Sequence, residues 1–371
     1  MSGRQLKAQT RTAAKGREEE RASDMAAKQN NDIVFAIPSK GSLYEGTLTF
    51  LKSAGVPVAY GNERRYTARL GGVEGISVLF QRAEEIPLKV ASGTADLGLT
   101  GEDLFREQAI HSDKPLLVLR DLGYGHARLV VAVPSPWIDV SSMEDLAELA
   151  FSFRLKHQRT LRIATKFPNL AREFLARYGV VNYALVESLG ATESAPVSGV
   201  ADLVIDLTSS GKTLSDNHLK TIKDGTVISS QACLIASRRI AHWDEARLER
   251  LETFLDMIES YLRGRDTYTL QAAVQRSKLA ELARLTHKWR LAYSLPMDTL
   301  APLGAKDEPF VVIRMTCPRN NLHQVILRLR ESGAEEVIVT QPEYVFHEQS
   351  ESFQRLKLLL KKQDNVEQPE D

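Results

Sequence analysis

The sequence predicts a two-lobed α/β protein that ends in a smaller βαββαβ domain. Three observations support this fold class. Short apolar runs, which are typical of buried parallel strands, alternate with helical patterns from residue 32 onward. The alternation occurs in two consecutive sets, and its character changes after residue 239. Two such sets predict two lobes with a ligand cleft between them.

The first set begins abruptly at Asp32. Residues 33–37 form a continuous apolar run that predicts a buried strand, and residues 38–42 predict a turn. Apolar residues then recur at helical spacing until Gly55, which is the residue type that often follows a helix. Further elements are predicted as strands at 76–80, 95–99 and 129–133 and a short helix at 86–92.

The second set has the same organisation, with strands predicted at 161–165, 183–187, 203–205 and 227–229 and a helix at 169–178. An apolar stripe from Leu248 to Leu262 then predicts a long helix. The βαββαβ order, which is the ferredoxin-like arrangement, follows as strands at 268–274, 290–294, 310–315 and 337–340 and helices at 277–286 and 322–329.

These elements define the predicted domains. Residues 1–31 are polar and mixed in charge, so we expect a disordered tail. The other predicted parts are a first lobe with linker helix (32–127 and 222–264), a second lobe (128–221), a ferredoxin-like domain (265–350) and a C-terminal tail (351–371).

Composition excludes several protein classes. The 48 basic and 48 acidic residues cancel, which gives no support to bulk binding of nucleic acid or of an anionic membrane. Two cysteines, Cys233 and Cys317, are too few for a secreted disulfide framework or a four-cysteine zinc site. No apolar run reaches 18 residues, and the tail lacks a signal core, so we expect a cytoplasmic protein.

The most informative segment runs from Ala201 to Thr213. A buried strand delivers Asp206 to its C-terminal end, and a loop of small hydroxyl residues follows. Such a loop presents backbone N–H groups and hydroxyls to a phosphate, and a helix starting near Thr213 would add positive potential. Asp202, four residues earlier on the same strand, lies about 13 Å from Asp206 and is interpreted as structural.

Two other interpretations of this loop exist. Gly211-Lys212-Thr213 resembles the end of a nucleotidase P-loop, but Asp206 stands where that motif requires glycine. A polar turn without any ligand is the other alternative, because serine, threonine and glycine simply favour turns.

Seven segments then occur in an order that is highly specific as a set: 37–41 (IPSKG), 82–87 (RAEEIP), 93–103 (GTADLGLTGED), 122–125 (LGYG), 164–169 (ATKFPN), 187–196 (ESLGATESAP) and 206–213 (DLTSSGKT). In this order the chain resembles the long-form ATP phosphoribosyltransferases. The resemblance covers about residues 32–240. It implies a core like that of periplasmic binding proteins with a C-terminal regulatory domain.

The resemblance implies that N1 of ATP displaces pyrophosphate from phosphoribosyl pyrophosphate at the first step of histidine biosynthesis. It places the ribose near Asp206 and the pyrophosphate, with Mg²⁺ held mainly by substrate phosphates, near Lys40, Gly41 and Arg64. The catalytic residues implied are Lys40, Arg64 and Asp206, the ATP-binding residues are Gly41, Arg82, Gly101 and Glu193, and the phosphate loop adds Thr208, Ser209, Ser210, Gly211, Lys212 and Thr213. Feedback inhibition by histidine and a homo-hexamer are also implied.

One departure from the family pattern affects the expected chemistry. Ser42 stands where the family has an arginine that bridges pyrophosphate and nucleotide, and Arg64, Arg65 and Arg69 are the candidates to replace its charge. Two alternatives therefore remain: a paralogue with weak or no catalysis that regulates or senses ligands, and a solute-binding module unrelated to transfer chemistry.

Overall fold

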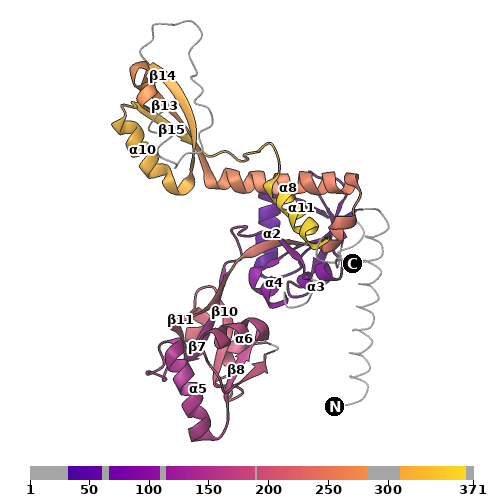
Figure 1. Cartoon of the computed structure of the whole chain (residues 1–371), viewed down its shortest axis with the longest axis vertical. Coiled ribbons are helices and arrows are strands. Elements are labelled where there is room, and N and C mark those ends of the chain that lie inside the picture. Colours follow the sequence, from indigo (N-terminus) through magenta and orange to yellow (C-terminus); the bar gives the residue numbers. More distant parts are fainter. Residues whose placement is uncertain (1–31, 61–66, 109–113, 189, 283–309, 365–371) are drawn as a thin grey trace, which may run out of the picture. The chain divides into compact units, whose positions relative to one another are not determined.

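The computed structural model describes residues 32–60, 67–108, 114–188, 190–282 and 310–364 (Figure 1). The chain divides into two compact units. One runs through Leu251 and takes in the residues from Ser352 onward, and the other comprises Glu252–Glu351. The first unit contains two mixed sheets with helices, so the predicted α/β class is confirmed. Within the ranges given above, no helix combines the length and apolar character needed to cross a bilayer.

The first sheet has the strand order β2-β3-β4-β1-β5-β12-β6. β1 (Ile33–Pro38) is central, pairs in parallel with β4 and β5, and is buried at every position, which explains its continuous apolar sequence. The other strands are β2 (Val58–Tyr60), β3 (Thr67–Leu70), β4 (Ile76–Gln81), β5 (Leu97–Gly101), β6 (Leu116–Leu119) and β12 (Ala232–Ala236). The helices that accompany them are α2 (Ser42–Ser53), α3 (Ile86–Ala91) and α4 (Glu102–Gln108).

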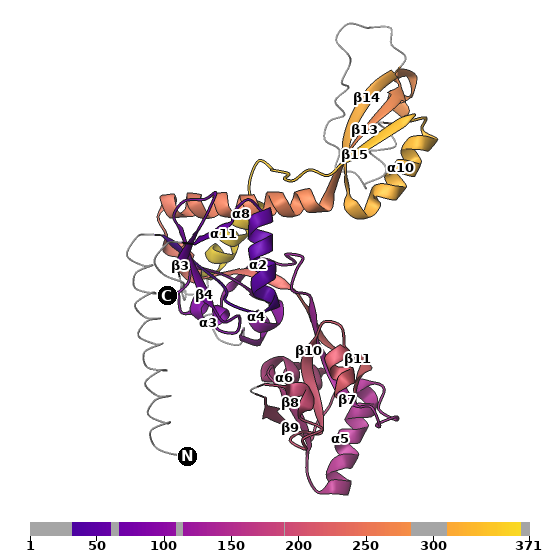
Figure 2. The ribbon, with the colours of Figure 1, turned by 180° about the vertical axis from the view of Figure 1, so that it is seen from behind.

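The second sheet has the order β11-β7-β10-β8-β9 (Figure 2). Its parallel part is β10-β8-β9, and β7 and β11 are antiparallel additions. The strands are β7 (Ala127–Pro134), β8 (Leu161–Thr165), β9 (Tyr183–Glu187), β10 (Leu203–Thr208) and β11 (Leu219–Ser230). The helical segments are α5 (Met143–His157), α6 (Pro168–Arg177), η1 (Thr192–Ser194) and α7 (Lys212–Asp216).

β11 changes the predicted boundary of the second lobe. The sequence placed residues 222–230 in the first lobe, but β11 pairs with β7 from Leu219 to Ser230. Its register shifts between Thr221 and Thr226 and again before Ile228. These irregularities, which are β-bulges or similar, break the regular alternation of a strand, so the pattern revealed only its last residues.

The second unit contains most of α8 (Glu245–Asp266), which continues into it from the first unit. A three-stranded antiparallel sheet of order β14-β13-β15 follows, and α10 (Leu322–Glu331) packs Val325 and Leu329 against it. The strands are β13 (Thr267–Gln275), β14 (Phe310–Pro318) and β15 (Glu336–Thr340). The predicted strand at 290–294 and the end of the helix at 277–286 lie outside the described residues.

The predicted C-terminal tail contains a helix, α11 (Glu351–Asp364). Phe353, Leu356 and Leu360 are buried, and the Arg355 guanidinium donates to the carbonyl oxygen of Val118 in β6. The charged residues of this segment suggested a tail, but the apolar residues between them recur at helical spacing and form one buried face.

Candidate active site

The carboxyl edge of the second sheet holds most of the predicted phosphate site. β8 and β10 run in parallel, with Ile205 opposite Thr165, so their C-terminal ends share one edge of the sheet. Asp206 lies at that end of β10, and Lys166 directly follows β8. Lys166 belongs to segment 164–169 but is not among the site residues predicted from the sequence; its position directly after a parallel strand is the signal that points to it.

Asp206 is a half-buried acid with little compensation for its charge. Its carboxylate accepts a hydrogen bond from the Leu207 N–H at 2.9 Å. Burial raises the pKa of Asp206 to about 6, against the lowering effect of that hydrogen bond and of nearby Lys166, and the charge of Glu193 raises it further. Since Glu193 contributes from η1, the structure brings two of the predicted site residues into electrostatic contact.

The loop after β10 has the form expected of an anion-binding turn. Buried Thr208 ends the strand, and its hydroxyl accepts from the Gly211 N–H at 2.8 Å. Gly211 has a φ of +79°, and no heavy atom lies within 4 Å of the place a Cβ would occupy. Ser209 and Ser210 are exposed, and among the described residues their backbone N–H groups have no acceptor. The helix predicted near Thr213 begins at Lys212.

Asp202 is structural, as the sequence suggested. Its carboxylate accepts from Arg159 at 2.6 and 2.8 Å and from the backbone N–H of Arg162 at 2.8 Å. Burial opposes ionisation of Asp202, but the hydrogen bonds from Arg159 and Arg162 outweigh it and hold its pKa well below the usual range. Asp202 therefore has no free capacity to bind a ribose.

The carboxyl edge of the first sheet holds the other predicted residues. The parallel strands β4, β1 and β5 end there, followed by Arg82, by Lys40 and Gly41, and by Gly101 as the last residue of β5. The first two loops are linked by the Ser39 N–H, which donates to the carbonyl of Gln81 at 2.7 Å. Lys40, Gly41 and Arg82 are exposed, whereas Gly101 is buried.

The arginines that were candidates to replace the missing charge are placed differently. Arg64 and Arg65 lie outside the described residues. Arg69 forms an ion pair of 3.5 Å with Asp32, which precedes β1. Because Lys40 follows the other end of β1, Arg69 cannot supply charge near Lys40 while this pair holds.

An aromatic cluster at this edge was not predicted. Tyr44 in the first turn of α2 and Tyr60 at the end of β2 share a hydrogen bond of 3.1 Å between their hydroxyls. The Tyr60 ring stacks on Phe80 with centroids 5.9 Å apart, and Tyr60 is 57% exposed. A tyrosine is uncharged at neutral pH, and the hydrogen bond with Tyr44 raises the pKa of Tyr60 further, to about 12. The cluster therefore offers a neutral surface on which a planar base can stack.

Two further acids near these residues serve the structure. Asp103 accepts a hydrogen bond from the Ser230 hydroxyl, and Glu107 accepts from the backbone N–H groups of Asn169 and Leu170 at 2.9 and 3.0 Å. Burial raises the pKa of both carboxyls. Because these bonds join α4 to β11 and α6, they tie this helix of the first sheet to the second lobe.

Comparison with known proteins adds independent findings. A family model described as HisG: ATP phosphoribosyltransferase matches residues 82–260. An ATP phosphoribosyltransferase of Afipia carboxidovorans is 38% identical over 329 residues, which covers 88% of this chain and 98% of that relative. One from a Bradyrhizobium species is 37% identical over 330 residues, with 89% and 98% covered.

Solved structures align with this chain at lower sequence identity. The ATP phosphoribosyl transferase (HisG:HisZ) complex from Thermotoga maritima aligns with a TM-score of 0.46 and 24% identity, over 61% of this chain and 96% of that chain. The P235GK mutant of ArgBP from T. maritima aligns with a TM-score of 0.37 and 12% identity, over 72% of this chain and 98% of that chain.

Proposed function

The chain belongs to the ATP phosphoribosyltransferase family, and from this premise we propose how its two sheet edges divide the reaction. The enzyme joins ATP to 5-phosphoribosyl 1-pyrophosphate and releases pyrophosphate, which is the first step of histidine biosynthesis. N1 of the adenine forms a bond to C1 of the ribose while the bond from C1 to the pyrophosphate oxygen breaks, and its electron pair leaves with the pyrophosphate.

The edge that contains Asp206 binds the phosphoribosyl group in this proposal. The exposed N–H groups and hydroxyls of Ser209 and Ser210 and the Lys212 ammonium hold the 5-phosphate. Asp206, whose carboxylate accepts only one N–H from its own loop, accepts hydrogen bonds from the ribose hydroxyls. This combination of an under-compensated acid and an open hydroxyl loop at one strand end is the observation that carries the proposal.

The edge that contains Lys40 binds ATP and the leaving pyrophosphate. Exposed Lys40 and Arg82 supply positive charge, and Gly41 leaves space for a phosphate because no heavy atom lies within 4 Å of its missing Cβ. The Tyr44, Tyr60 and Phe80 cluster provides a stacking surface for adenine. Gly101 at this edge and Glu193, which acts on Asp206 from the second lobe, complete the proposed ATP site, and Arg64 is proposed as a further cation.

Mg²⁺ would neutralise the pyrophosphate as it leaves. Among the residues that the structure describes, no group of three histidine, cysteine, aspartate or glutamate side chains is arranged to hold a metal ion. We therefore propose that substrate phosphate oxygens supply most of its ligands, which is the usual binding mode of this ion at phosphate sites.

Catalysis in this arrangement rests on alignment and electrostatics. The transition state separates a cationic ribosyl group from an anionic pyrophosphate, so a carboxylate beside the ribose and cations beside the pyrophosphate stabilise both developing charges. Asp206 must be ionised for this role, and its raised pKa of about 6 predicts that activity falls as pH drops through that value.

Membership of the family is also the basis for our proposals on regulation and assembly. We propose that the second unit is a ferredoxin-like regulatory domain, that histidine inhibits the enzyme through it, and that the protein assembles as a cytoplasmic homo-hexamer. The three-stranded sheet with α10 on one face supports the domain assignment.

The direct test is pyrophosphate release from ATP plus phosphoribosyl pyrophosphate, with and without histidine. Turnover that histidine suppresses supports the full proposal. Binding of both substrates without turnover would indicate the non-catalytic paralogue, to which the Ser42 departure points. Binding of neither would indicate a solute-binding module.

A further inference from the structure

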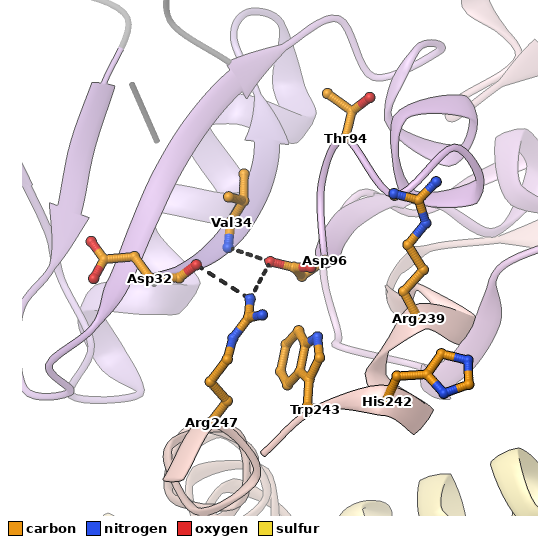
Figure 3. Close-up of a pocket in the computed structure, with 9 residues that line it drawn as sticks. Asp32, Val34, Thr94, Asp96, Arg239, His242, Trp243 and Arg247 are labelled. Carbon is orange, nitrogen blue, oxygen red and sulfur yellow. Dashed lines mark hydrogen bonds and ion pairs between the residues drawn. The ribbon is translucent and has the colours of Figure 1, made fainter. Parts of the chain in front are cut away.

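A pocket with several charged side chains in its lining lies at the opposite edge of the first sheet from Lys40 (Figure 3). It has a volume of about 670 Å³ and forms where β1 and β5 begin, next to the turn that leads into α8. Pockets of 300–1,000 Å³ typically hold small molecules up to about the size of a nucleotide. All of its lining residues belong to the first compact unit.

The acceptors of this pocket are already engaged. The Asp96 carboxylate accepts from the Val34 N–H at 2.8 Å and from the Arg247 guanidinium at 3.2 Å. The Asp32 carbonyl accepts from the same guanidinium at 3.4 Å, and the Asp32 carboxylate pairs with Arg69. The acidic side chains therefore add little uncompensated negative charge to the pocket.

Several of its donors are unused within the described residues, among them the buried Nε of Arg247. Within the part of the chain that the structure describes, neither the Arg239 guanidinium nor the Trp243 indole N–H has an acceptor. The Arg247 guanidinium lies 4.0 Å from the centre of the Trp243 ring, which is a cation–π contact that favours this ring position, and Figure 3 shows Trp243 between the side chains of Arg247 and Arg239. A fixed indole N–H beside an uncompensated guanidinium is suited to an acceptor-rich group.

The backbone makes room for Arg239. Gly93 has a φ of +67°, and a Cβ added there would lie only 2.4 Å from Cδ and Nε of Arg239. Because Gly93 has no side chain, the Arg239 guanidinium can lie directly against the turn before β5. Gly93 belongs to a segment that the family resemblance already covers, but the contact with Arg239 is visible only in the fold.

We propose that this pocket binds a small oxyanion, the phosphate or carboxylate group of a metabolite, between Arg239 and Trp243. A guanidinium donates two parallel N–H groups to either kind of oxyanion, and the engaged acids leave it free to do so. The site is separate from the proposed substrate sites, because the latter lie at the carboxyl ends of the strands and this pocket lies at their amino ends.

The fluorescence of Trp243 reports anion binding in the test of this proposal. The chain has three tryptophans, so the double variant Trp137→Phe, Trp289→Phe leaves Trp243 alone. Sodium phosphate and sodium acetate are each titrated into this protein while its emission is followed, with sodium chloride at equal ionic strength as the blank. We expect a saturable change in emission with at least one of the two anions, and the preferred anion identifies the headgroup class.

Three variants in the same background assign the signal. Arg239→Gln should weaken binding about tenfold or more, as expected for loss of a charge-assisted pair. Arg250→Gln, on α8 with its Nε donating to the Ala246 carbonyl, is the matched control and should leave binding unchanged. Lys212→Ala should also leave it unchanged, because Lys212 lies in the proposed substrate loop.

The proposal is wrong if neither anion gives a saturable change, if Arg239→Gln binds as the parent does, or if Lys212→Ala removes the signal. Should the double tryptophan variant fold poorly, the shift in melting temperature caused by the same anions is compared between wild type, Arg239→Gln and Gly93→Ala. Equal shifts in all three would also overturn the proposal.

Discussion

The two ends of β10 carry two aspartates in opposite environments. Asp202, before the strand, is bound by two arginines and one backbone N–H, and its pKa lies well below the usual range. Asp206, near the other end, accepts one N–H from its own neighbour, and burial raises its pKa to about 6. The fold satisfies the first acid and leaves the second to be satisfied by something else. An acid held at a cost to stability is expected at a functional site.

The largest expected difference between the two aspartates is in their effect on catalytic activity. Asp206→Asn should lower kcat/KM for phosphoribosyl pyrophosphate by about 100-fold or more, because it removes the negative charge beside a cationic transition state. Steady-state pyrophosphate release measures it. Asp202→Asn is the matched control and should stay within about threefold of wild type, since it lies at the far end of the strand. Equal losses of kcat/KM in both variants would contradict a specific role of Asp206 in the reaction.

Stability should change in the opposite sense to activity. The folded pKa of Asp206 is raised above its unfolded value, so the ionised acid destabilises the fold at pH 7, and stability returns as pH falls from about 6 toward 4. Asp206→Asn should therefore raise the free energy of unfolding at pH 7 by about 2 kcal/mol. Urea unfolding at pH 7 and pH 4 measures this, and the gain should largely vanish at pH 4.

Asp202→Asn should give a loss of stability. Its folded pKa is lowered, so the ion pairs contribute fully above the unfolded pKa and are lost as pH falls below it. We expect a loss of about 1–2 kcal/mol at pH 7, which reflects hydrogen bonds to a charged group that is still partly open to solvent. The urea midpoint at pH 7 is the measurement, and an unchanged midpoint would show that Arg159 and Arg162 contribute no net stability.

The smallest expected effect concerns the other sheet edge. Ser42 is exposed at the start of α2, so Ser42→Arg fits without displacing a neighbour and restores the family's charge beside Lys40. We expect KM for one of the two substrates to fall about two- to fivefold, the modest effect typical of an exposed charge. Ser53→Arg adds the same charge at the far end of the helix and should change neither KM. If Ser42→Arg leaves both KM values unaltered, another cation already supplies the positive charge that the family's arginine provides.

The sequence revealed the parts of this fold whose signal is local. β8 and β9 have the bounds predicted for them, because each is an apolar run interrupted by at most one polar residue before its end. β8 is largely buried, whereas β9 is the half-exposed edge strand of its sheet. β2 was not predicted because it is short and mostly exposed. The C-terminal helix α11 was not predicted either, because charged residues separate the apolar positions on its buried face.

Only part of the candidate site could be predicted from local sequence patterns. The position of Asp206 at a strand end followed from the pattern, as did the structural role of Asp202 from its distance along the strand. The electrostatic contributions of Lys166 and Glu193 to Asp206 depend on segments 13 to 40 residues away, which no local pattern encodes. The pocket of Arg239 and Trp243 joins three segments of the chain that are distant in sequence, so only the folded protein shows it.

Calorimetric binding of phosphoribosyl pyrophosphate to wild type, Asp202→Asn and Asp206→Asn at pH 7.5 shows which end of β10 holds the sugar phosphate. We expect wild type and Asp202→Asn to bind with similar Kd and Asp206→Asn to bind about tenfold or more weakly, because a ribose hydroxyl loses its charged acceptor. If Asp206→Asn binds as tightly as wild type while Asp202→Asn does not, the carboxyl end of β10 is not where the sugar phosphate is held.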